Sequence, residues 1–182
     1  MKDPSRFENQ DRLDEINIER IMELADLKQG QVVCDYGAGT GIFTKALAKK
    51  TQSKVYALDA NEDMLKLVQK KIREFGLSKV ILQKVEHDQV PLEAGTIDLF
   101  VIITVFHHIE NTMKFVADLK TSLKEGGKVA LVEFHKKNSP SGPAESMRLS
   151  PQELDQIFLA GGFKNDVFES LGENMYLCIY KL

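Results

Sequence analysis

"CDYGAGTG", residues 34–41, places three glycines and an aspartate directly after an apolar run. Glycine is used where the backbone takes a positive φ or where a ligand comes close to the main chain. If the apolar run is a strand and a helix begins near Gly41, the loop lies at the carboxyl end of that strand. Open α/β sheets bind their ligands at this edge, against the N–H groups of a helix start. The stretch therefore predicts both a fold class and a binding site.

Runs of strand length recur along the chain and are rich in apolar or β-branched residues. They cover residues 31–36, 54–59, 79–85, 97–104 and 127–134. Two further runs, 163–170 and 174–182, are separated only by a turn-like Leu-Gly-Glu. The last pair therefore predicts an antiparallel hairpin.

Helices are predicted between these strands by their capping residues. Asn61 predicts a helix start and Gly76 its end, with Met64, Leu65, Val68, Ile72 and Phe75 on one face. Asn111 predicts a second start, with Phe115, Val116, Leu119 and Leu123 inward and Gly126-Gly127 at the end. Ser150-Pro151-Gln152-Glu153 is a capping box, and it opens a helix that we expect to stop at Gly161-Gly162.

Alternating strands and helices predict an α/β protein, a three-layer Rossmann-like sandwich with a mostly parallel sheet and a C-terminal antiparallel hairpin. We expect residues 1–182 to form a single domain, in which 1–16 are a polar lead. For this lead, with Phe7 and Leu13, two interpretations stay open: a lid over the ligand and a frayed terminus.

Composition excludes several classes of protein. The formal charge of -3 lacks the basic excess of nucleic-acid or membrane-surface binding. The N-terminus has no apolar leader, and the apolar stretch 99–106 is too short to span a bilayer, so a cytoplasmic protein is expected. Cys34 and Cys178 lie in strand-like runs without metal-binding spacing, which predicts buried free thiols and no metal site.

Two ligand classes compete for the glycine loop. The dinucleotide fingerprint GxGxxG would have its third glycine at Ile42, whereas Gly37, Gly39 and Gly41 form GxGxG. A carboxylate at Asp35 repels a pyrophosphate and suits a cation. S-adenosylmethionine (SAM) carries an ammonium and a sulfonium and no phosphate, so the loop favours SAM over a nicotinamide dinucleotide and over an oxidoreductase.

The sequence resembles the class I SAM-dependent methyltransferases, and within them the type 11 group. Four blocks carry the resemblance, in the family's order: 18–44, 55–65 with "VYALDANEDML", 85–111, and 123–134 with "LKEGGKVALVEF". The resemblance implies a seven-stranded sheet whose last hairpin supplies an antiparallel strand. It also implies SAM as cofactor and transfer of its methyl group to an acceptor, for which we expect a small molecule.

The resemblance also implies the cofactor-binding residues. Gly37 and Gly39 would pass close to the methionine part of SAM, and Asp35 would accept from its ammonium, directly or through water. Asp59 would take both ribose hydroxyls, and Ala60 would face the adenine edge. Glu86 stands at the position that binds the adenine amino group, where the family usually has Asp, with His87 as a backbone contact; Asp88 stays open as the alternative to Glu86.

No catalytic base is identified by the sequence. Methyl transfer is an in-line displacement on an activated group, so a base is needed only where the acceptor starts protonated. His107, His108 and His135 follow predicted strands and are the candidates, with packing or helix capping as the structural alternative for each. A SAM-binding module without catalysis, or one that depends on a partner, is the alternative function.

Overall fold

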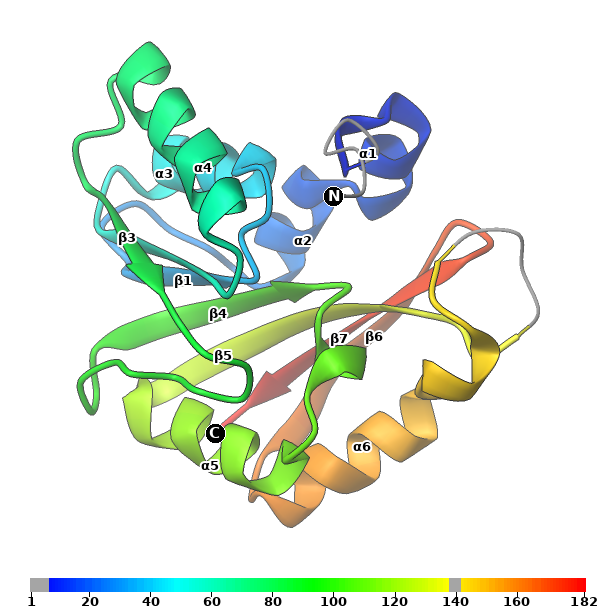
Figure 1. The fold of residues 1–182 in the computed structure, drawn as a ribbon. Coiled ribbons are helices and arrows are strands. Elements are labelled where there is room, and N and C mark those ends of the chain that lie inside the picture. The colour runs from blue at the N-terminus through cyan, green and yellow to red at the C-terminus, as the bar shows by residue number, and fades with distance from the viewer. Residues whose placement is uncertain (1–6, 138–141) are drawn as a thin grey trace.

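A seven-stranded sheet, in the order β3-β2-β1-β4-β5-β7-β6, forms the centre of the protein (Figure 1). The computed structural model describes residues 7–137 and 142–182, so residues 1–6 of the predicted lead lie outside it. The strands are β1 Val33–Tyr36, β2 Val55–Asp59, β3 Val80–Lys84, β4 Ile97–Ile103, β5 Leu123–Phe134, β6 Lys164–Leu171 and β7 Met175–Lys181. β1 to β5 pair in parallel, and β7 is antiparallel to β5 and β6. The predicted fold class and closing hairpin are confirmed.

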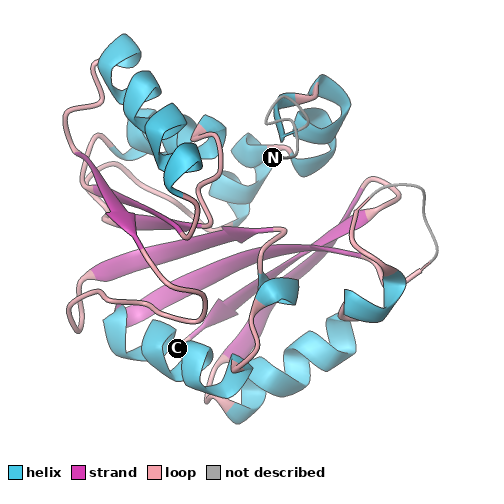
Figure 2. Ribbon diagram, in the orientation of Figure 1, coloured by secondary structure: helices cyan, strands magenta, loops and turns pink. Residues whose placement is uncertain are grey.

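Helices cover both faces of this sheet (Figure 2). They are α1 Gln10–Ile16, α2 Ile18–Leu24, α3 Ile42–Thr51, α4 Glu62–Phe75, α5 Thr112–Ser122 and α6 Pro151–Ala160, with short 3-10 turns η2 Phe106–His108 and η3 Glu145–Met147. Successive strand residues point to opposite faces: Val33 packs with α2 and α3, whereas Cys34 packs with α5 and α6. The three predicted layers follow from this alternation.

Most predicted helix ends are confirmed by their caps. The Asn61 side chain accepts from the Asp63 N–H, and Gly76 ends α4 in the left-handed conformation. The capping box of Ser150 and Glu153 opens α6. Phe75 differs from its prediction, because its side chain is exposed and its ring lies 3.5 Å from the Lys45 ammonium, a cation–π contact outside the core.

The boundary between α5 and β5 also differs from the prediction. Asn111 caps α5 as expected, but the helix ends at Ser122 and not at Gly126-Gly127, because β5 begins at Leu123. Leu123 is buried and pairs with Ile97, after which the ladder shifts register. Pairing with β4 therefore overrides the local helical pattern.

The N-terminal lead is helical from Gln10 onward. Asn17, at φ 48°, ends α1, and its side chain accepts from the Arg20 N–H at the start of α2. Cys34 and Cys178 are free and buried, as predicted. Across residues 7–137 and 142–182, none of the helices combines the length and the apolar character that a membrane span requires.

Candidate functional site

The glycine loop joins β1 to α3 at the carboxyl edge of the sheet. Gly37, Gly39 and Gly41 all have positive φ, of 77°, 52° and 79°, and Gly41 is the N-cap of α3. These are backbone conformations that residues with a Cβ rarely adopt. The predicted loop geometry is therefore present, with its N–H groups at a helix start.

Each of these glycines meets different surroundings. A Cβ at Gly37 would lie 2.3 Å from a methyl group of Val105, and a Cβ at Gly41 would lie 3.1 Å from Val68. A Cβ at Gly39 would meet only the Gly37 carbonyl oxygen, at 3.9 Å. Packing thus accounts for Gly37 and Gly41, whereas Gly39 borders open space that a ligand can use.

Asp59, the last residue of β2, is hydrogen-bonded to this loop. Its Oδ2 accepts from the Gly39 N–H at 2.8 Å, and its Oδ1 accepts from the Asn61 N–H at 2.8 Å. An ionised carboxylate has about four acceptor positions, so each oxygen can accept one more hydrogen bond. Ala60, beside it, is partly exposed. This arrangement suits a ligand with two neighbouring hydroxyl groups next to Gly39.

Asp35 lies beneath the loop and is 2% exposed. Its carboxylate accepts from the Thr44 hydroxyl in the first turn of α3. Burial, and then the negative charge of Asp59, raise the pKa of Asp35 to about 7, against the effect of its hydrogen bonds from Thr44. With a pKa of about 7, Asp35 is about half ionised at neutral pH. Asp59 and the ionised fraction of Asp35 give the loop a negative field that disfavours a phosphate and favours a cation.

The end of β3 lies next to Asp59, because the Val85 N–H donates to the Asp59 carbonyl at 3.2 Å. Glu86 and His87 follow and are exposed. The Asp88 carboxylate accepts from the N–H groups of Glu110 and Asn111, at 3.1 and 2.9 Å, just before α5. Asp88 therefore holds the turn before α5, which leaves Glu86 as the acid with an exposed side chain at this corner.

Of the candidate bases, His107 is engaged by a residue that the sequence analysis missed. Its Nδ1 lies 2.8 Å from Oε2 of Glu133, and the two side chains are 5% and 1% exposed. Glu133 stands in the otherwise apolar run 129–134. An acid among predicted buried strand residues was the available signal. The pair joins the ends of β4 and β5 inside the protein.

The other two histidines are more accessible. His108 is exposed, and its ring centroid lies 4.2 Å from that of His107. His135 follows β5, where its Nε2 lies 3.2 Å from the Ser170 hydroxyl and its ring packs beside Tyr176. The structure thus separates the candidates into a buried pair with Glu133, an exposed ring beside that pair, and a residue at the tip of β5.

The N-terminal segment crosses the same edge of the sheet. Glu8 forms an ion pair with Lys71 of α4 at 2.8 Å, and Arg12 donates to the Thr104 hydroxyl at 3.1 Å. The ring of Phe7 lies 5.7 Å from the Arg12 guanidinium. Sequence reasoning named Phe7 and Leu13 here, and it missed both polar contacts because each depends on a residue far along the chain.

Thr104 is a backbone outlier at the end of β4. Its φ is 55°, a conformation that a β-branched residue rarely adopts. Its N–H donates to the Val132 carbonyl at 2.8 Å, so pairing with β5 holds it in place. Strained backbone of this kind concentrates at functional sites, which agrees with a site at the carboxyl edge.

Comparison with known proteins points to one family. A family model described as a methyltransferase domain, the type 11 model, matches residues 34–131. The crystal structure of a SAM dependent methyltransferase from Aquifex aeolicus is similar over 100% of this chain and 99% of that one, with a TM-score of 0.90 and 26% sequence identity.

Curated relatives agree with this result over part of their length. An uncharacterized methyltransferase of Geobacillus sp. strain WCH70 is 34% identical over 119 residues, which cover 64% of this chain and 54% of the relative. The ubiquinone/menaquinone biosynthesis C-methyltransferase UbiE of Wigglesworthia glossinidia brevipalpis is 30% identical over 109 residues, 58% of this chain and 44% of the relative. The chain spans about half the length of these relatives.

Proposed function

Because this chain belongs to the type 11 methyltransferase family, we propose that it is an enzyme that transfers the methyl group of SAM to a small-molecule acceptor. The observation that carries the proposal is the pairing of Asp59 with Gly39. In this pair, the Asp59 carboxylate can accept further hydrogen bonds, and the space beside the Gly39 Cα, where a side chain would lie, is open. SAM offers two ribose hydroxyls and a methionine chain that fit these features.

The other proposed contacts with SAM lie around Asp59 and the end of β3. In this proposal Asp59 accepts from the ribose hydroxyls, Gly37 and Gly39 border the methionine chain, and Ala60 faces the adenine edge. Glu86 accepts from the adenine amino group, and the N–H of His87 meets the ring. We assign this contact to Glu86 and not to Asp88 because the Asp88 carboxylate is already used by two N–H groups.

Asp35 acts on the cofactor from below the loop. Its burial and its hydrogen bond from Thr44 favour a role through its charge or through a water molecule rather than direct contact with the ammonium. When SAM is bound, its sulfonium supplies an already activated methyl group, and the protein's task is to hold the acceptor in line with it. The negative field of Asp35 and Asp59 favours this cationic cofactor over nucleotides that carry phosphates.

The segment 7–16 serves as a lid within a single domain in this proposal. Contacts at both ends support it: Glu8 reaches α4, and the Glu15 carboxylate accepts from the Asn174 N–H at 2.8 Å, at the turn between β6 and β7. Between them Arg12 contacts Thr104. Because these contacts cross the carboxyl edge, the segment can restrict the release of a ligand held there.

A cytoplasmic location is proposed as well. Cys34 and Cys178 are both free and buried, which agrees with a reducing compartment.

Calorimetric titration tests the function. We expect S-adenosylhomocysteine (SAH) to bind with micromolar or tighter affinity and NADH to show no binding. Transfer of labelled methyl groups from SAM to a panel of small molecules then separates an enzyme from a binding module. Binding of NADH alone, or of neither compound, would contradict the proposal.

A further inference from the structure

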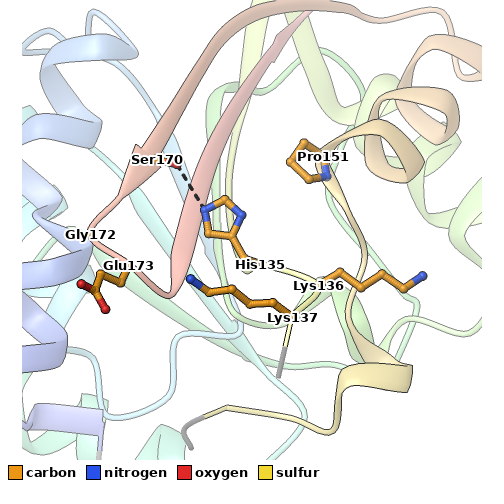
Figure 3. A pocket seen from close by; sticks show the side chains of 7 residues that line it. All are labelled: His135, Lys136, Lys137, Pro151, Ser170, Gly172 and Glu173. Carbon is orange, nitrogen blue, oxygen red and sulfur yellow. Dashed lines mark hydrogen bonds between the residues drawn. The ribbon is translucent and has the colours of Figure 1, made fainter. Parts of the chain in front are cut away.

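A cavity lies beyond the end of β5, away from the glycine loop. It has a volume of about 460 Å³, within the usual range for small-molecule sites. Its lining comes from the chain after β5, the start of α6 and the turn between β6 and β7 (Figure 3): His135, Lys136, Lys137, Pro151, Ser170, Gly172 and Glu173. It is large enough for one substituted aromatic ring.

This cavity and the glycine loop share one edge of the sheet. β5 pairs with β4, and β4 pairs with β1, all in parallel. The register places Tyr36, the end of β1, level with Leu131 of β5, and β5 continues for three residues to Phe134. With about 4.8 Å between neighbouring strands and about 3.3 Å per residue, the ends of β1 and β5 are separated by roughly 14 Å. A small molecule in the cavity can therefore reach toward a cofactor held at Gly39.

His135 is the titratable ring at the centre of the cavity. Burial, and then the charge of Lys137, lower its pKa below the usual range, although Glu15 and the Met175 backbone oppose the shift. The other groups that face it are the Ser170 hydroxyl and the Tyr176 ring, with the charges of Lys136 and Glu173 on the cavity wall. The imidazole is therefore neutral near pH 7 and can accept a proton.

The two lysines of the cavity differ in their partners. Lys136 forms an ion pair with Glu153 at 2.6 Å, whereas Lys137 has no ion pair with any residue of the ranges 7–137 and 142–182. Their side chains extend in opposite directions, with Lys136 pointing away from Glu173 (Figure 3). The ammonium of Lys137 is thus the cation that can stabilise an anion in the cavity.

We propose that this cavity binds the methyl acceptor and that the acceptor is a small molecule with an acidic hydroxyl group, a phenol or an enol. The inference rests on the proposed function and names its substrate class. The acceptor hydroxyl displaces the Ser170 hydroxyl from Nε2 of His135, its proton moves to Nε2, and Lys137 stabilises the oxyanion. The oxygen then forms a bond to the methyl carbon while the carbon–sulfur bond breaks, its electron pair stays on sulfur, and His135 returns the proton to water.

The test uses SAH-saturated protein and 4-nitrophenol as the probe, since its anion absorbs visible light. At about one pH unit below the pKa of the free probe, we expect the bound probe to show the anion's absorbance. Lys137→Ala and His135→Asn should each weaken binding at least about tenfold, whereas the control Lys164→Ala, on β6, should leave it unchanged. The probe 4-nitroanisole, which lacks the hydroxyl, should bind at least about tenfold more weakly.

Three results would overturn the inference: no binding of 4-nitrophenol, equal binding of 4-nitroanisole, or unchanged binding in Lys137→Ala. Binding of SAH is measured on the same samples by calorimetry. If SAH binds and the phenol does not, the acceptor assignment fails and the cofactor assignment stands. If SAH does not bind, the proposed function itself fails.

Discussion

Nδ1 of His107, after β4, lies between the two carboxylate oxygens of Glu133, at 2.8 and 3.1 Å, near the end of β5. The Glu133 carboxylate also accepts from the His107 N–H at 3.3 Å. Both side chains are almost fully buried. Burial of a carboxylate is costly without partners, so this pair fixes the ends of two central strands relative to each other.

Removal of His107 should therefore destabilise the fold. His107→Ala leaves Glu133 buried without its main partner, and we expect the free energy of unfolding to fall by about 3–5 kcal/mol. Urea denaturation measures the change. His87→Ala, an exposed histidine, is the control and should stay within about 0.5 kcal/mol of the parent. Equal stability of the two variants would show that the buried pair contributes nothing.

Asp35 should make stability depend on pH. The pKa of Asp35 is about 7 in the folded protein, whereas the ordinary pKa of an aspartate is 3.8. Between these pH values the unfolded chain has released a proton that the folded protein keeps. The free energy of unfolding therefore falls as pH rises through this window. Asp35→Asn keeps an acceptor for Thr44 and removes the charge. In urea denaturation, we expect the free energy of unfolding of this variant to exceed that of the parent by roughly 2–4 kcal/mol near pH 8 and to differ little near pH 4. A difference that does not depend on pH would contradict this prediction.

Gly37 and Gly39 should respond differently to a side chain. Gly37→Ala collides with Val105, so we expect lost stability that the second change Val105→Ala partly restores. A Cβ at Gly39 meets only the Gly37 carbonyl oxygen, at 3.9 Å, so the side chain of Gly39→Val extends into the proposed cofactor space. The variant should fold, at a cost of about 1–2 kcal/mol for its positive φ, and lose SAH binding in calorimetry. Normal SAH affinity in folded Gly39→Val would remove the loop from the site.

Asp59→Ala should weaken SAH binding by roughly 1–3 kcal/mol, because the ribose hydroxyls lose their acceptor. The variant also frees the N–H groups of Gly39 and Asn61, so its folding is checked by circular dichroism. Asp98→Ala is the matched control. It removes a carboxylate that also accepts from a backbone N–H, but at the start of β4, on the side of the sheet opposite to the glycine loop. Unchanged affinity in a folded Asp59→Ala protein would exclude Asp59 from the site.

The lid is tested by kinetics. Glu8→Gln removes the charge that pairs with Lys71, and we expect SAH to dissociate about 2–5 times faster in stopped-flow measurements. Glu19→Gln, on the exposed side of α2, should not change the rate. Equal rates for all three proteins would leave the segment 7–16 without a role in ligand release.

Local signals were sufficient to predict much of this structure. The caps at Asn61, Asn111 and Ser150 are made within a few residues, and they appear as predicted. The positive φ of the loop glycines follows equally from residue type. Contacts between distant residues were not predictable in this way: the start of β5 at Leu123 depends on Ile97. Likewise, residues 10–16 of the lead form a packed helix because Arg12 and Glu15 find partners at Thr104 and Asn174.

The single residue between α1 and α2 has a consequence for how such a domain changes its specificity. Asn17 turns the chain through a left-handed conformation and caps α2 with its own side chain, so α2 does not need α1 in order to begin. α1 contacts the carboxyl edge through Arg12 and contributes Ile16 to the core that α2 also lines. Evolution can therefore vary the exposed positions of the first helix, and with them the contacts over this edge, while α2 and the sheet keep their own start signal intact.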